Sequence, residues 1–199
     1  MANPVSARDI RRVIANATSL QVSDRANIVM RVFAAMRACG VQRVLMMPEN
    51  GGIRSLLKRA LQREQGLGIN RFPELEMTNT QISGTVADTF AATKAMLDSG
   101  VKAIVVLGGD GTHRAVVKIC EQVPIAGIST GTNNAFPEHR EPTITGLAVG
   151  MVATGRIPEG VAFAPKMGVP ERPEHHEMTN SGTRSGSMSF LHAFETRCK

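Results

Sequence analysis

The feature that most constrains the fold is an unbroken apolar run that leads directly into a glycine-rich turn. Residues 102–107 are predicted to form a strand, because Ala103-Ile104-Val105-Val106-Leu107 contains no polar residue. A continuous run of this kind is typical of a strand buried on both faces, as in a parallel sheet. The turn Gly108-Gly109-Asp110-Gly111-Thr112 follows at once, and a helix is predicted for residues 112–122. This order predicts a ligand loop at the carboxyl end of a buried strand.

The residue types in this turn suit an anionic ligand. Its three glycines would let a ligand approach the backbone closely and would permit positive φ. The next helix offers N–H groups and a positive dipole end to a phosphate. Asp110 would repel phosphate, and it makes sense there as a holder of Mg²⁺ or as the base that accepts a proton from a hydroxyl. Thr112 is predicted to cap the helix or to donate to a phosphate oxygen. The alternative is a tight turn in which Asp110 only caps the helix.

The spacing of the glycines separates this turn from two common nucleotide loops. It lacks the three spaced glycines of the dinucleotide fingerprint, and no Gly-Lys-Ser/Thr follows as in a Walker loop. A second loop, Ser129-Thr130-Gly131-Thr132-Asn133-Asn134, follows the next predicted strand. Its hydroxyls and carboxamides suit phosphate, ribose or adenine, and the alternative is a solvated loop with an Asn cap.

Strands and helices alternate along the rest of the chain. Further strands are predicted at residues 41–47, 74–78 and 125–128, and further helices at residues 8–20, 24–39, 53–61, 83–99 and 142–154. Asp24 is predicted to cap the second helix, and Val86, Phe90 and Leu97 to face inward from the fourth. The rhythm predicts an α/β layered fold, with a largely parallel sheet and helices on both faces. Residues 102–107 are expected at its centre, flanked by the strands at 41–47 and 125–128.

Composition sets limits on compartment and partners. The three cysteines, Cys39, Cys120 and Cys198, show no metal spacing, and a cytoplasmic protein with free thiols is the expectation. No apolar run approaches a membrane span. The net charge of +6 is concentrated before residue 64 and suits anionic nucleotides. Nucleic acid is disfavoured, because seven Phe, no Trp and no Tyr leave few stacking residues. A homo-oligomer is left open.

The character of the chain changes near residue 163. Residues 1–163 are expected to form the α/β nucleotide-binding domain, and residues 164–199 an irregular, disordered tail with no sustained periodicity. His175-His176 lies in that tail without metal-spaced partners. Cys120 is expected to be a core thiol. His113 follows the glycine turn, where it either touches phosphate or has only a structural role.

Two of these segments resemble a known family. Val105-Val106-Leu107-Gly108-Gly109-Asp110-Gly111-Thr112 resembles the signature of the ATP–NAD kinase superfamily, which includes diacylglycerol and sphingosine kinases and 6-phosphofructokinases. The second loop, extended to Ile128 and Ala135-Phe136-Pro137, resembles the acetoin catabolism protein X branch. Residues 3–12 and Val44-Leu45-Met46-Met47-Pro48 are similar to the same branch.

The resemblance implies an N-terminal α/β nucleotide domain, a β-rich second domain, and an active site between them. It implies phosphoryl transfer from ATP, with Mg²⁺, to a hydroxyl, which in the kinases belongs to the adenosine ribose of NAD. By motif position Asp110 would be the base or would position the metal, and Gly108, Gly109, Gly111 and Thr112 would cradle phosphate. Thr132, Asn133 and Asn134 would line the nucleotide site, and Asn3 would sit in the first loop.

Two departures from the family pattern bear on activity. Family members begin with a strand just before the Asn-Pro loop, and only Met1-Ala2 precede that loop here, so the first strand is expected to be missing or a stub. The β-rich second domain is expected to be absent. Two functions therefore stay open: a Mg-dependent kinase of NAD or a related nucleotide, and a truncated, non-catalytic nucleotide-binding remnant or accessory protein. A lipid or sugar kinase is a third.

Overall fold

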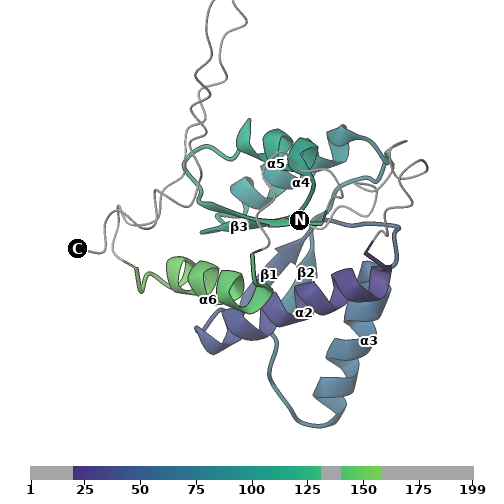
Figure 1. Cartoon of the computed structure of the whole chain (residues 1–199), viewed down its shortest axis with the longest axis vertical. Helices are drawn as coiled ribbons and strands as arrows, with labels where there is room; N and C mark the ends of the chain where they lie inside the picture. The colour runs from purple at the N-terminus through teal and green to yellow at the C-terminus, as the bar shows by residue number, and fades with distance from the viewer. Residues whose placement is uncertain (1–19, 131–139, 158–199) are drawn as a thin grey trace, which may run out of the picture. The chain divides into compact units, whose positions relative to one another are not determined.

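The computed structural model describes residues 20–130 and 140–157 (Figure 1). Helices and strands alternate along these residues in the order α2 (Val22–Ala38), β1 (Arg43–Met46), α3 (Ile53–Gly66), β2 (Glu74–Met77), α4 (Val86–Asp98), β3 (Ile104–Gly108), α5 (Asp110–Val117), β4 (Ile125–Ser129) and α6 (Pro142–Ala153). The α/β class is confirmed. The helix predicted at residues 8–20 and the predicted tail lie outside the described residues.

The strands form two parallel pairs. β1 pairs with β2 from Arg43↔Glu74 to Met46↔Met77. β3 pairs with β4 from Ile104↔Ile125 to Gly108↔Ser129. Within the described residues β3 therefore has β4 as its neighbour, and the prediction that the strand at 41–47 also pairs with it is wrong. Pairing requires strands about 4.8 Å apart, and β1 and β3 instead both line a groove of about 390 Å³.

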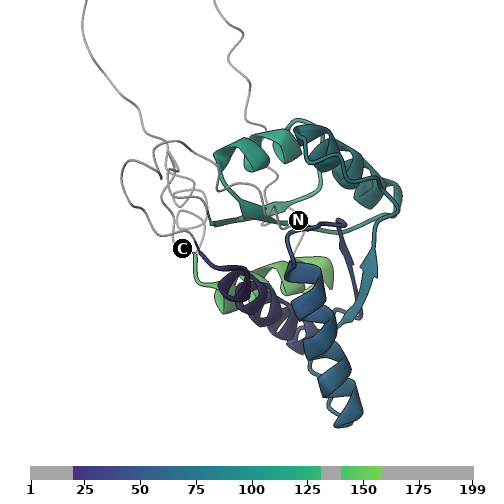
Figure 2. The same ribbon diagram turned by 90° about the vertical axis from the view of Figure 1, so that its right-hand side faces the viewer.

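β3 is buried on both faces, as its sequence predicted. Ile104 and Val106 belong to an apolar cluster with residues of α4 and α5, whereas Leu107 belongs to a second cluster with residues of α2, α3 and α6. Successive side chains of a strand point to opposite faces, so β3 is covered by helices on each side. Figures 1 and 2 show α4 and α5 on one side of β3, and α2 and α6 on the other.

Two glycines allow α6 to lie directly against α2. A Cβ atom at Gly146 would come within 2.6 Å of the Val32 carbonyl oxygen and 2.8 Å of the Ala35 Cβ. A Cβ atom at Gly150 would come within 2.7 Å of the Cys39 Cβ. Because Gly146 and Gly150 are four residues apart, they occupy the same face of α6. Their missing side chains therefore set the close contact between the two helices (Figures 1 and 2).

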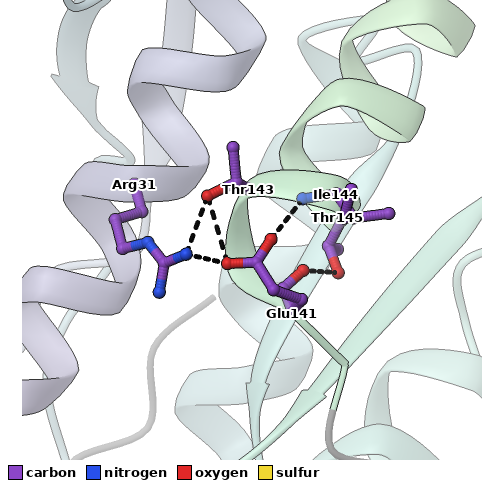
Figure 3. A network of polar contacts seen from close by, with 5 residues as sticks. All are labelled: Arg31, Glu141, Thr143, Ile144 and Thr145. Carbon is purple, nitrogen blue, oxygen red and sulfur yellow. Dashed lines mark hydrogen bonds and ion pairs between the residues drawn. The ribbon is translucent and has the colours of Figure 1, made fainter.

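A polar network fixes the start of α6 to the side of α2 (Figure 3). The carboxylate of Glu141 accepts a hydrogen bond from the Ile144 backbone N–H at 2.7 Å, which caps the helix. Its other oxygen pairs with Arg31 of α2. Thr143 Oγ1 lies 3.0 Å from Arg31 and 3.1 Å from Glu141 Oε1. Glu141 therefore serves as helix cap and as ion-pair partner at once.

Three local predictions need correction. The N-cap of α2 is Gln21, and Asp24 accepts a hydrogen bond from the Gln21 N–H at 3.1 Å from inside the first turn. Val86 of α4 is exposed, whereas Leu97 packs against the apolar cluster as predicted, and the fully buried positions are Thr89, Ala92, Thr93 and Met96. Thr93 is buried without cost because its Oγ1 donates to the Thr89 carbonyl oxygen at 2.7 Å. The helix α5 begins at Asp110 and ends at Val117, five residues earlier than predicted.

Candidate functional site

The glycine turn carries the chain from β3 into α5 without left-handed backbone. Gly109 is the N-cap of α5, with φ −88° and ψ 177°. Gly108, Gly109 and Gly111 are not among the described glycines with positive φ, so that expectation is wrong. Their lack of side chains matters for space. A Cβ atom at Gly108 would lie 3.0 Å from the Cβ and Oγ1 of Thr112, whereas Gly111 faces open space.

The carboxyl ends of β3 and β4 are joined where the two loops begin. The Thr130 N–H donates to the Gly108 carbonyl oxygen at 3.3 Å, one step beyond the last ladder pair. Thr130 is buried, and its Oγ1 has no hydrogen-bond partner within the described residues. A buried hydroxyl without a partner costs about 1–3 kcal/mol. The orphaned hydroxyl beside the glycine turn therefore suits a polar ligand at this end of the strands.

Asp110 is the first residue of α5 and is half-buried. The alternative that it acts as the N-cap is wrong, because Gly109 holds that position. Its carboxylate lies in the first turn, where it interacts favourably with the helix dipole. Asp110 also lies at the end of β3, where a ligand would contact it. Within the described residues no three His, Cys, Asp or Glu side chains gather as a metal site. A single carboxylate still fits Mg²⁺, which binds through one or two carboxylates together with substrate phosphates.

His113 has a structural role in this unit. Its Nε2 lies 3.1 Å from the Val106 carbonyl oxygen and donates to it, since a carbonyl can only accept. Gly127 of β4 makes room for the ring, because a Cβ atom there would lie 3.1 Å from Nε2. Burial lowers the pKa of His113, while the Val106 hydrogen bond and the Asp110 charge oppose that shift. The ring is therefore held against the β3–β4 pair, and this geometry favours the structural alternative.

The structure brings together only part of the predicted site. Gly108, Gly109, Asp110, Gly111 and Thr112 lie in one turn, and Thr112 is buried as the third residue of α5. Its side chain packs on Gly108. The other predicted binding residues, Thr132, Asn133, Asn134 and Asn3, lie outside the described residues.

Two buried polar residues were not singled out from the sequence. Thr130 is one, although it belongs to the predicted second loop. Glu49 is the other: it follows β1, is buried, and accepts the Arg54 N–H at 2.6 Å through Oε1. Its Oε2 has no partner within the described residues. Thr130 immediately follows β4 and Glu49 lies three residues after the end of β1, and a polar residue near the carboxyl end of a strand is the signal that marks them.

Of the remaining candidates, Cys120 lies in the core, and His175-His176 lies outside the described residues. Cys120 is buried in the cluster with α4 residues, as predicted, and burial raises the pKa of its thiol. None of the helices in the described ranges has the length and apolar character needed to cross a membrane.

Comparison with known proteins agrees with this geometry. The model of the ATP-NAD kinase N-terminal domain matches residues 12–157. Acetoin catabolism protein X of Cupriavidus necator is 60% identical over 164 residues, which cover 82% of this chain and 45% of that relative. The chain thus spans less than half the length of this relative. No solved structure matches. The matched domain agrees with the parallel pairing of β3 with β4 and with the glycine turn that follows β3. This chain belongs to the ATP–NAD kinase family.

Proposed function

We propose that this chain carries the phosphate-binding half of a phosphotransferase that moves a phosphoryl group from ATP to a hydroxyl of NAD or a related nucleotide. The observation that carries the proposal is the joined end of β3 and β4. Two paired strands end there. They are followed by the open turn at Gly111, the half-buried carboxylate of Asp110 and the orphaned hydroxyl of Thr130. Ligands of open α/β sheets bind at this end of the strands.

Each residue of the turn has a distinct part in the proposed chemistry. Gly111 leaves the backbone accessible, so that phosphate oxygens can approach the first turn of α5, and Gly108 makes room for the Thr112 side chain. Thr130 Oγ1 donates to the ligand, which relieves its unpaired burial. Asp110 holds the metal or accepts the proton of the attacking hydroxyl. Mg²⁺, when bound, neutralises phosphate charge during transfer.

The identity of the acceptor rests on family membership. The matched domain belongs to kinases of NAD, and the relative from Cupriavidus necator bears a name that links it to acetoin catabolism. We therefore propose NAD as the acceptor, with a place in acetoin catabolism and a cytoplasmic location. Thr132, Asn133, Asn134 and Asn3 are proposed to complete the nucleotide site.

A second candidate function is a non-catalytic nucleotide-binding protein. It would use the same turn and the same nucleotide site as the kinase. It would differ from the kinase in binding nucleotide without transferring a phosphoryl group.

Calorimetry followed by an activity assay separates these functions. The 199-residue chain is titrated with ATP, ADP and NAD, each with Mg²⁺ and with chelator, and NADP formation is then followed in a coupled assay. Binding of ATP with NADP formation supports the kinase. Binding without NADP formation supports the non-catalytic alternative. If no nucleotide binds under either condition, both are wrong for this chain.

A further inference from the structure

The ring of His113 lies in the space that Gly127 leaves on one face of the β3–β4 pair. A Cβ atom at Gly127 would come within 3.1 Å of Nε2, 3.2 Å of Cε1 and 3.6 Å of Cδ2, all atoms of that ring. The imidazole comes from α5, whereas Gly127 belongs to β4. The ring therefore occupies the place that a side chain of β4 would otherwise take.

A hydrogen bond fixes the same ring to β3. Its Nε2 donates to the Val106 carbonyl oxygen at 3.1 Å. Val106 and Gly127 are partners in the parallel ladder, so the ring contacts both strands at one register position. One side chain of α5 is thus joined to two neighbouring strands, by a polar contact on one and by a close steric fit on the other.

The placement of α5 depends on contacts of this kind. The helix has eight residues (Asp110–Val117), and an isolated helix of that length is unstable in water. Its buried apolar side chains, Ala115 and Val116, hold it to the core, but apolar burial is non-directional. A hydrogen bond weakens steeply when it is bent. The contact of His113 with the strands therefore fixes the rotation of α5 about its own axis.

The rotation of α5 also decides where Asp110 points. Asp110 and His113 are three residues apart, so they occupy the same face of the helix. The two groups sense each other, because burial lowers the pKa of His113 and the charge of Asp110 opposes that shift. A rotation that moves the ring away from Gly127 moves the Asp110 carboxylate with it. The place of Asp110 at the end of β3 thus depends on a contact with β4.

We propose that His113 is a positioning residue, which holds α5 to Val106 and Gly127 and so presents the Asp110 carboxylate to a nucleotide bound with Mg²⁺. This inference rests on the proposed function, in which Asp110 holds the metal or accepts a proton. The Nε2 proton of His113 is used by Val106 and is not available to a phosphate. His113 therefore acts through Asp110.

The first test is a double-mutant cycle between His113 and Gly127. Gly127 is not among the described glycines with positive φ, so alanine suits its backbone. Gly127→Ala should raise the unfolding equilibrium constant about tenfold, because the new methyl group displaces the ring. In the His113→Ala background the same change should lower that constant about threefold, since glycine costs conformational entropy in a strand. Urea denaturation of the four proteins gives the cycle. Effects of the same sign and size in both backgrounds overturn the proposal.

The second test asks whether the contact acts on the site. ATP affinity is measured with Mg²⁺ and with chelator, and the ratio of the two affinities is compared among wild type, His113→Ala and His113→Gln. Alanine should reduce the ratio about tenfold, as loss of a group that orients a metal ligand does. Glutamine keeps a donor for Val106, so its ratio should stay within about twofold of wild type. Loss of stability alone lowers both affinities alike and leaves the ratio unchanged. An unchanged ratio in His113→Ala overturns the proposal.

Amide exchange in the first turn of α5 gives a readout that needs no ligand. The N–H groups of residues 112 and 113 donate to the Gly109 carbonyl oxygen at 3.0 and 3.2 Å. Their exchange should become about tenfold faster in Gly127→Ala and in His113→Ala. Gly66→Ala on α3, where a Cβ atom meets no neighbour, is the matched control and should leave it unchanged. A wild type that binds no ATP refutes the proposed function and this inference with it. ATP binding together with unchanged exchange in both variants refutes the inference alone.

Discussion

Gly146 is a position where one methyl group decides how closely two helices approach. Gly146→Ala should lower the free energy of unfolding by about 1–3 kcal/mol, because the new Cβ would meet the Val32 backbone at 2.6 Å. The gain in helix propensity is only about 1 kcal/mol. Urea denaturation measures the difference.

The matched control is another helical glycine. Gly66, the last residue of α3, has no atom within 4 Å of the position a Cβ would take. Gly66→Ala should therefore raise the stability by about 0.5–1 kcal/mol. If Gly146→Ala were as stabilising as Gly66→Ala, the close contact between α2 and α6 would not exist in solution.

Asp110 is the residue on which the proposed chemistry depends. Asp110→Asn should keep the fold, since the side chains are isosteric, and should weaken the Mg²⁺ dependence of nucleotide binding. Where turnover is detected, loss of a general base should slow it by about 10²–10⁴-fold. Nucleotide affinity is measured for both proteins with Mg²⁺ and with chelator. Identical magnesium responses would remove Asp110 from the mechanism.

His113 should make the stability depend on pH. Burial lowers its pKa in the folded protein, so the unfolded chain takes up a proton first as the pH falls below about 6.5. The contribution is fully present above that pH and is lost as the pH falls toward the folded value. His113→Gln keeps a donor for the Val106 carbonyl but cannot titrate. The loss of unfolding free energy between about pH 7 and pH 5 should be smaller in the variant, and equal losses would contradict the assignment.

At the scale of elements, the start of α6 depends on one carboxylate. Glu141→Ala should cost about 1 kcal/mol of stability, because the Ile144 N–H loses its cap. Arg31→Ala leaves the cap in place, removes the half-exposed ion pair and the hydrogen bond to Thr143, and should cost less. Thermal or urea unfolding of both variants gives the comparison. Equal losses would show that the ion pair, and not the cap, holds the helix start.

The elements themselves were largely predictable, and their faces and partners were not. The strand and turn around residues 104–112 follow from apolar continuity and glycine content, and every described strand lies where it was predicted. The buried face of α4 was predicted only in part, at Leu97, because Thr89 and Thr93 occupy much of it, and the Thr93 hydroxyl is satisfied within the helix. The end of α5 was missed because apolar residues continue beyond Val117, where the helix gives way to turns.

The site, too, was predictable only where its residues are contiguous in the sequence. The turn Gly108–Thr112 is contiguous, so its motif could be found directly in the sequence. The orphaned hydroxyl of Thr130 depends on how two loops meet after pairing, and the contact between His113 and Gly127 depends on which strands pair. Burial and edge pairing are properties of the assembled fold, which residue patterns along one segment do not contain.

For the whole molecule, the sequence predicts that residues 164–199 add little to stability. Limited proteolysis should remove them first and leave a core that ends near residue 163. Mass spectrometry of the fragments and urea denaturation of the trimmed core are the measurements. A chain whose last segment resists protease as long as the core does would contradict this prediction.

The contact between α2 and α6 also bears on how the chain is made. The two helices are joined through Gly146 and Gly150, yet about 100 residues separate the end of α2 from the start of α6. At a synthesis rate of roughly 5–20 residues per second, α2 waits roughly 5–20 s on the ribosome before α6 has been polymerised. During that interval Val32, Phe33 and Met36 lack the partner that covers them in the finished protein. The nascent chain therefore exposes an apolar helix face that a holding chaperone can protect.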